Sequence, residues 1–119
     1  MANDLKVMDL LVAGMHAEGQ RQQLIAKNVA NINTDGYRRL DHDFEAALSK
    51  ALDKKTDLDV AAIEYEAFEP LTTQINTQGS DVNLDQEVGE MVKNTLRHKT
   101  YMLLLKKKYQ QMDEAVRIS

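Results

Sequence analysis

The sequence contains no cysteine and no tryptophan, and it has one proline among its 119 residues. Without cysteine the chain forms neither a disulfide framework nor a thiolate metal site, so it is compatible with oxidising and reducing compartments alike. Aromatic residues make up only 5% of the chain, which argues against a large globular core. These absences exclude the small disulfide-rich folds and leave one domain's worth of chain.

Long hydrophobic runs are absent as well. The apolar stretch near the N-terminus carries the single base Lys6 and is broken by Asp4 and Asp9, unlike the uninterrupted region of a cleaved secretory signal. No run approaches the length that spans a membrane. We therefore expect no membrane insertion and no signal cleavage. The net charge of -4 argues against nucleic-acid binding, since the acidic stretch after Arg38 and Arg39 would repel phosphates.

The chain has no recognisable catalytic or cofactor motif. His16 and His98 have no serine, cysteine or acid at a spacing that forms a base and nucleophile pair, and no glycine-rich phosphate loop is present. One cluster offers imidazole and carboxylate groups, but its spacing matches no metal motif and favours a solvated acidic patch; it consists of Asp41, His42, Asp43 and Glu45. We expect no enzyme activity, no cofactor, no metal and no small-molecule substrate.

What the sequence does contain is an apolar stripe in its C-terminal third. The positions follow one another at alternating gaps of four and three residues over more than four heptads, a period typical of helices that pack along a narrow seam. Eight of the ten positions are apolar, so the helix must pack against other helices. The ten are Leu84, Val88, Met91, Thr95, His98, Met102, Leu105, Tyr109, Met112 and Val116.

A second, weaker stripe lies near the N-terminus, where Glu18 and Gln22 interrupt it. Its members are Met8, Leu11, Met15, Ile25, Val29 and Ile32. Since both ends of the chain present apolar stripes at helical spacing, both require helical partners. We expect the two stripes to be the surfaces through which subunits pack together.

Local signals divide the chain into three parts. A helical pattern runs from Leu5 to about Asn31, with Gly14 and Gly19 marking points of close approach or bending. Asparagines, Asp35 and Gly36 then predict a helix stop and a turn. The boundaries we expect are 1–37 for the N-terminal helix and turn, 38–80 for a variable middle segment, and 81–119 for a C-terminal helix.

The middle segment is the least determined part. Residues 43–53 predict either a short helix, with one apolar face, or an irregular arm. The alternation in 61–67 is typical of a half-buried strand that 71–75 would pair with as a hairpin. Asn83 is a good N-cap for a final helix that ends near Arg117. The expected fold is therefore mainly α, with long terminal helices packed as a helical hairpin around an irregular or β-hairpin middle.

Charge is distributed unevenly along the chain. Residues 38–83 hold ten acids and five bases, whereas the segment from Leu84 onward holds five acids and seven bases, including the run Lys106, Lys107 and Lys108. Acids early and bases late in a helix suit its macrodipole. The lysine run is most simply a solvated helix face whose aliphatic stems cover neighbouring side chains.

Two blocks resemble the bacterial flagellar basal-body rod protein family. Residues 21–37 are similar to its N-terminal motif, in which Asn-(Val/Ile)-Ala-Asn precedes Thr-Pro-Gly-Tyr. The matching residues are Asn28, Ala30, Asn31, Thr34, Gly36 and Tyr37. Asp35 replaces the usual proline, which keeps a turn former but loses the fixed φ. Residues 82–101 are similar to the start of the family's C-terminal helix. Within the family, two sister proximal rod proteins are the competing matches, and Phe44-Glu45-x-x-Leu48 favours one of them.

The resemblance implies a structural subunit of the proximal rod in the flagellar basal body. Such proteins pass unfolded through the flagellar type III export apparatus and join other rod proteins in a helical drive shaft that crosses the periplasm. A repeated, non-closing contact between subunits builds such a filament. The alternative is a helical adaptor or export chaperone that stops at fixed stoichiometry. We expect Asn31 and Asn33 to make turn bonds, and Asn28 either to do the same or to fix register between packed helices.

Overall fold

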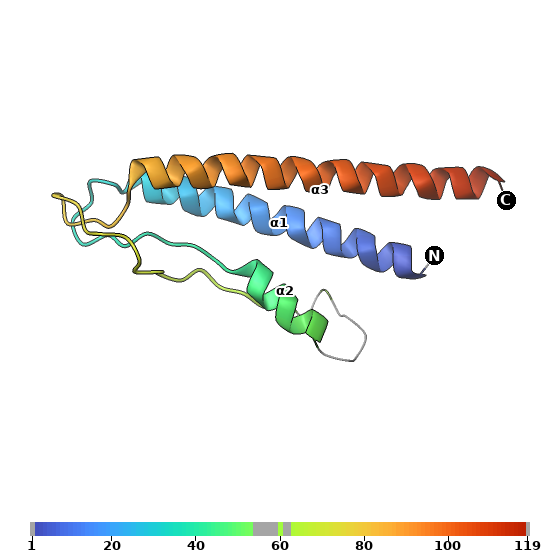
Figure 1. Ribbon diagram of the computed structural model, residues 1–119, viewed down its shortest axis with the longest axis horizontal. Helices are drawn as coiled ribbons and strands as arrows, with labels where there is room; N and C mark the ends of the chain where they lie inside the picture. The colour runs from blue at the N-terminus through green and yellow to red at the C-terminus, as the bar shows by residue number, and fades with distance from the viewer. Residues whose placement is uncertain (1, 54–59, 61–62, 119) are drawn as a thin grey trace.

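The structure, a computed structural model, describes residues 2–53, 60 and 63–118. It contains α1 (Ala2–Ala30), α2 (Phe44–Asp53) and α3 (Leu84–Ile118). Helices α1 and α3 lie side by side and antiparallel, with both chain termini at the same end, and α2 lies beyond α1 (Figure 1). The Cα atoms extend over 64 × 28 × 15 Å, so the molecule is a long, flat body. The mainly α hairpin predicted from the sequence is confirmed.

Side-chain caps fix where two of the helices begin. The carboxamide of Asn83 accepts a hydrogen bond from the backbone N–H of Gln86 at 3.0 Å, as predicted for the N-cap of α3. Asp43 caps α2 in the same way through the N–H of Ala46 at 3.0 Å. Because each cap satisfies a donor that has no partner inside the helix, both starts are specified locally. The short-helix prediction for residues 43–53 is therefore confirmed over the irregular arm.

Helices α1 and α3 meet along a seam with the 3.5-residue period of a coiled coil. On α1 the inward positions are Leu11, Gly14, Glu18, Arg21, Ile25 and Asn28, and on α3 they are Glu87, Met91, Asn94, His98, Tyr101 and Leu105. Gly14 allows a close approach, as predicted, and what approaches is the ring of Tyr101. No atom comes within 4 Å of a Cβ built at Gly19. The seam is apolar toward the chain termini and polar at its centre.

The hydrophobic core of the described residues is small. Its buried members are Leu11, Ala17, Ile25, Phe44 and Val82. More polar and charged side chains are buried than apolar ones, namely Glu18, Arg21, Asn28, Arg39, His42, Ser80, Asp81, Glu87 and Asn94. Eighteen large hydrophobic side chains are exposed in the same part of the chain. Isolated soluble domains normally keep such residues inside and charged ones outside, so this monomer leaves much of its apolar surface uncovered.

The middle segment packs along α1 rather than forming a hairpin of its own. Residues 61–62 lie outside the described residues, and no strand forms in 63–67 or 71–75. Instead a single antiparallel bridge joins Asp41 to Phe68. The predicted alternation is nevertheless present, because Tyr65 packs its ring against Phe44 at 5.2 Å between centroids while Glu64 and Glu66 are exposed. Of the two alternatives predicted for the middle segment, the described residues show the irregular one, because Phe68 pairs with Asp41 in the chain before α2.

Candidate assembly surface

The two apolar stripes predicted from the sequence are each divided by the fold into an inward and an outward half. We label the positions of each heptad a to g, with Leu11 of α1 and Met91 of α3 at a positions of the seam. The members of both stripes then fall at a and e positions. The a positions, such as Leu11, Ile25 and Leu105, turn toward the partner helix. The e positions lie beside the seam. In an antiparallel helix pair the e positions of both helices flank the same side, so the outward halves share one face.

We call this surface the open face. Its members are Met8, Met15 and Val29 of α1 with Val88, Met102, Tyr109 and Val116 of α3. Val88, Met102, Tyr109 and Val116 are each about half exposed or more, and Val29 is also exposed. Met8 and Met15 are partly covered. An apolar strip of this length on one face is a candidate surface for contact with other molecules.

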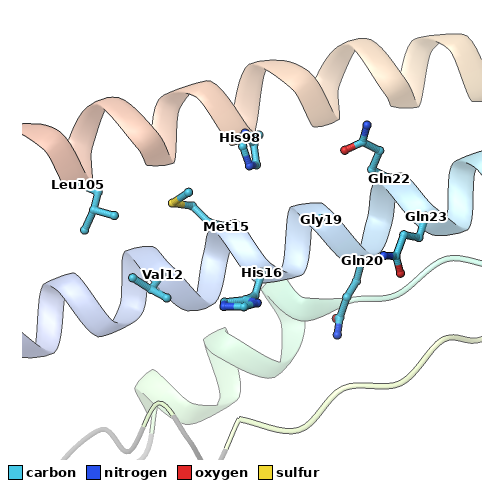
Figure 2. A pocket seen from close by; sticks show the side chains of 9 residues that line it. All are labelled: Val12, Met15, His16, Gly19, Gln20, Gln22, Gln23, His98 and Leu105. Carbon is cyan, nitrogen blue, oxygen red and sulfur yellow. The ribbon is translucent and has the colours of Figure 1, made fainter.

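A shallow groove of about 550 Å³ runs along this face between the two helices. Met15 and Gln22 of α1 line it together with His98 and Leu105 of α3 (Figure 2). Figure 2 shows Met15 directed toward α3, and α2 on the side of α1 away from it. The groove is open to solvent along its length and is lined by more apolar than polar surface. Its shape suits a ridge of side chains from another helix.

The opposite flank of the helix pair is covered by the middle segment. His42 lies buried against α1, where its Nε2–H donates to the carbonyl oxygen of Ala17 at 2.7 Å and its Nδ1 accepts from the N–H of Phe44 at 3.4 Å. These two bonds require the neutral tautomer with the proton on Nε2. Tyr65 donates its hydroxyl to Gln20 of α1 at 2.6 Å. The middle segment therefore covers one flank of the helix pair, and the open face lies on the other flank.

A cluster of charged and amide groups joins α1, α3 and α2 at the centre of the seam. We call it the central cluster: Glu18, Arg21, Glu45, Asn94 and Arg97. Oε1 of Glu18, only 2% exposed, accepts from Arg21 NH1 and from Arg97 Nε, each at 2.7 Å. Oε2 of Glu18 accepts from Asn94 at 2.9 Å. Arg21 also pairs with both carboxylate oxygens of Glu45, at 3.0 and 2.8 Å. Each buried charge is therefore neutralised by a neighbour.

Electrostatic coupling in this cluster shifts two pKa values in opposite directions. Burial alone would lower the pKa of Arg21, but its hydrogen bonds to Glu45 outweigh that effect and raise the pKa above its ordinary value. Burial would raise the pKa of Glu45, yet the hydrogen bond from Arg21 leaves it below its ordinary value. Both groups therefore stay ionised at neutral pH, and the pair holds α2 against α1.

A second group of buried polar residues lies where the turn after α1 meets the start of α3. Asn28, fully buried, pairs its side-chain amide with the backbone of Leu40, donating to the carbonyl at 2.9 Å and accepting from the N–H at 2.8 Å. Its Oδ1 also accepts from the hydroxyl of Tyr37 at 2.8 Å, and its amide reaches Glu87 of α3 at 3.3 Å. Glu87 in turn accepts from Arg39 at 2.7 Å. Asn28 thus ties three segments of its own chain together.

The remaining motif residues shape the turn itself. Asn31 donates to the carbonyl of Lys27 and accepts from the hydroxyl of Thr34, which are the turn bonds expected of it. Gly36 adopts a φ of 77°, and its N–H bonds the carbonyl of Gly79, whose φ is 81°. These conformations favour glycine. Asp35 stands in the place of the usual proline and lies close to Gly79. A Cβ at position 79 would collide with the carboxylate of Asp35.

Sequence reasoning found the stripes but missed the buried polar groups. It treated Glu18 as an interruption, although Glu18 is the hub of the central cluster, and it did not single out Arg21, Glu87 or Asn94. The signal was available, because these residues continue the 3.5-residue spacing of the seam. Within the described ranges no three histidine, aspartate or glutamate side chains converge on a common metal position. None of the described helices has the length and apolar character to cross a membrane.

Comparison with known proteins finds similarity to one family. Residues 8–38 match the family model described as flagella basal body rod protein. The chain is 28% identical to the flagellar basal body rod protein FlgB of Buchnera aphidicola, over 78% of this chain and 80% of the relative. The chain is therefore similar to flagellar basal-body rod proteins. It is also 26% identical to FlgB of Escherichia coli K12, covering 71% of this chain and 73% of the relative. With FlgB of Cereibacter sphaeroides it shares 28% identity, covering 87% and 92% respectively.

The matched segment contains most of α1 and the turn that follows it. It therefore includes Glu18 and Arg21 of the central cluster, and Asn28 with its partner Tyr37, whereas Leu40 lies two residues beyond it. The rod-family motif thus coincides with the residues that hold the helix hairpin together. Its physical role in this chain is to fix the turn and the register between α1 and α3.

Proposed function

We propose that this protein is a structural subunit of the proximal rod of the bacterial flagellar basal body, and that it assembles through the open face of its helix hairpin. Its relatives carry the name of a basal body rod protein. The observation that carries the proposal is the excess of exposed over buried apolar side chains among the described residues, eighteen large ones against five buried hydrophobic residues.

Energetics favour assembly over an isolated fold. Burying a large apolar side chain contributes about 1.5–3 kcal/mol, so covering the seven members of the open face contributes on the order of 10 kcal/mol. That gain offsets much of the cost of ordering long helices whose own seam is rich in polar groups. We infer that the helices reach full order only when neighbouring subunits cover them, as segments that fold on binding do.

The partners we propose are other rod proteins and further copies of this chain, arranged in a helix around the rod axis. Export through the flagellar type III apparatus without signal cleavage, and final placement in the periplasm, complete the proposal. A small core with charged groups at its centre is consistent with a subunit that unfolds readily for passage. The proposal assigns no catalytic role, cofactor or small-molecule substrate to the chain.

The second class of function, a helical adaptor or export chaperone, would use the same face to hold one partner. The comparisons do not favour it, since the relatives are named as rod proteins. A chaperone would saturate at fixed stoichiometry, whereas a rod subunit forms open-ended assemblies.

The proposal is tested by complementation of a strain that lacks its own copy of this protein. Met102→Asp places a charge on the open face without touching the seam, so it should abolish rod assembly and motility while the secreted subunit remains present. The matched control is Ile75→Asp, at an exposed apolar residue outside the helices, which should swim normally. Normal motility of Met102→Asp, with the subunit found in purified basal bodies, would contradict the proposal.

A further inference from the structure

The flat shape of the molecule puts opposite charges at opposite sides. In Figure 1 the three parts lie in the order α3, α1 and middle segment across the body. Because α1 separates the other two, the outer side of α3 and the outer side of the middle segment are the two long sides of the molecule. The two parts approach each other beside the central cluster, where Lys93 of α3 lines one pocket with Asp43 and Phe68 of the middle segment.

The outer side of α3 is basic. Residues 91–112 contain six lysines and arginines and no aspartate or glutamate. The exposed lysines on the side of α3 that faces away from the seam form what we call the basic strip: Lys99, Lys106 and Lys107. Exposed apolar residues, Val92, Leu96 and Leu103, lie between them. An apolar helix side bordered by lysines is a surface that suits an acidic partner.

The outer side of the middle segment is acidic. Its exposed carboxylates form the acidic strip: Asp53, Glu64, Glu66 and Glu69. Glu64 and Glu66 point away from α1 because Tyr65 between them packs its ring against His42 and Phe44. Lys50 is the single exposed base of α2, and Phe68 adds an exposed apolar ring beside Glu69. The acidic strip therefore has the same mixture of charge and apolar surface as the basic strip, with the opposite sign.

We propose that the basic strip of one copy of this protein binds the acidic strip of a second copy. The contact joins two different surfaces, so a bound pair still presents one free acidic strip and one free basic strip, and the chain of contacts does not close on itself. Complementary strips steer approach and fix the register of neighbouring subunits. The inference rests on the proposed function and adds to it which sides of adjacent subunits meet.

Cross-linking between single-cysteine variants tests the contact, because the chain has no cysteine of its own. Ala67→Cys labels the acidic side and Leu103→Cys the basic side, and neither removes a charge. Mixed at low salt and high concentration, the two variants should give more mixed dimer than either gives with itself. The excess should disappear at about 1 M salt, where the screening length falls to about 3 Å. Pairing Ala67→Cys with Ala26→Cys, on the exposed side of α1, is the control and should show no excess.

Charge reversal then tests the cause. Lys99→Glu/Lys106→Glu/Lys107→Glu in the Leu103→Cys copy should abolish the excess, as should Glu64→Lys/Glu66→Lys/Glu69→Lys in the Ala67→Cys copy. Combining the two reversed copies should restore it. Lys27→Glu, a reversal on α1, should leave it unchanged. A mixed dimer at the statistical level, or one indifferent to both reversals, would overturn the inference.

The proposed strip contact and the proposed assembly through the open face can be disproved independently. If Met102→Asp blocks rod assembly while the triple lysine reversal assembles normally, the strip contact is wrong and the proposed function stands. If neither change affects assembly, both are wrong. An anionic lipid surface is the other partner that lysines and apolar residues suit. Binding of wild-type protein to vesicles containing phosphatidylserine, lost in the triple lysine variant and accompanied by no excess of mixed dimer, would assign the basic strip to a membrane instead.

Discussion

The ring of Tyr101 on α3 lies directly on Gly14 of α1, where a Cβ would come within 2.5 Å of the ring carbons Cε1 and Cζ. This contact lies on the N-terminal side of the central cluster. Burial there also raises the pKa of the Tyr101 hydroxyl. The glycine is therefore needed for close packing and not for its backbone freedom, because it lies inside a regular helix.

Gly14→Ala is expected to destabilise the helix pair by about 1–3 kcal/mol through overpacking, after any gain in helix propensity. Gly19→Ala is the matched control in the same helix, since open space surrounds its Cβ position, and it should stabilise by up to about 1 kcal/mol. Thermal unfolding followed by circular dichroism measures both. Equal stabilisation by the two alanines would show that the ring moves aside without cost.

Glu18→Gln should destabilise the fold by about 3 kcal/mol, because it removes the charge that two arginines share in a buried position. Glu45 continues to pair with Arg21, so the loss falls mainly on Arg97 and on the register of α3. Gln22→Ala, at an exposed neighbouring position on α1, should change stability by less than about 0.5 kcal/mol. Urea unfolding of the three proteins makes the comparison. A Glu18→Gln protein as stable as wild type would refute the role of the cluster as the link between α1 and α3.

Asn28→Ala should cost about 3 kcal/mol, since it leaves the backbone groups of Leu40 and the hydroxyl of Tyr37 without their partner. Asn33→Ala changes an exposed asparagine of the same turn and should be nearly neutral. Hydrogen exchange should show faster exchange in the Asn28 variant at the amide of Leu40 and through the first turns of α3. If Asn28→Ala also assembles into functional rods, this residue has no part in setting register.

Stability should fall in acid through the Arg21 and Glu45 pair. Because the folded pKa of Glu45 lies below its ordinary value, its contribution is fully present above about pH 4.3 and is lost as the pH falls through the folded pKa. Since the Glu45 side chain is 49% exposed, screening limits that contribution to about 1 kcal/mol. Glu45→Gln should remove this part of the acid dependence, which a series of urea midpoints at decreasing pH would reveal. An unchanged acid profile in the variant would contradict the assignment.

The sequence predicted the helices well because their signals are local. The cap at Asn83 and the glycine turn at Gly36 act within a few residues, so no knowledge of the fold is needed to recognise them. The cap at Asp43 was not recognised, and the short helix stayed an alternative to an irregular arm. The apolar stripes were also recognised, but a stripe does not reveal which part of it the chain covers itself. That division depends on which residues of α1 and α3 face each other. Polar contacts such as those between Glu18 and Asn94 determine this.

The hairpin in the middle segment could not be excluded from sequence alone. The alternating pattern around Tyr65 is real, but it is satisfied by packing on His42 and Phe44 instead of by a neighbouring strand. Alternation records which side chains are buried and carries no information on what buries them. Likewise, the acidic patch around His42 was expected to be solvated, whereas the imidazole is buried and both its nitrogens are bonded.

The central claim is that the open face is exposed in the monomer and covered in the assembled rod. Met102→Cys would place the only thiol of the chain on that face, and its reaction with a maleimide can be followed in the free subunit and in intact purified basal bodies, with Ile75→Cys as the reference position. The account predicts rapid labelling of the Met102→Cys monomer and strong protection in the basal body. Equal labelling of Met102→Cys in both states would contradict it.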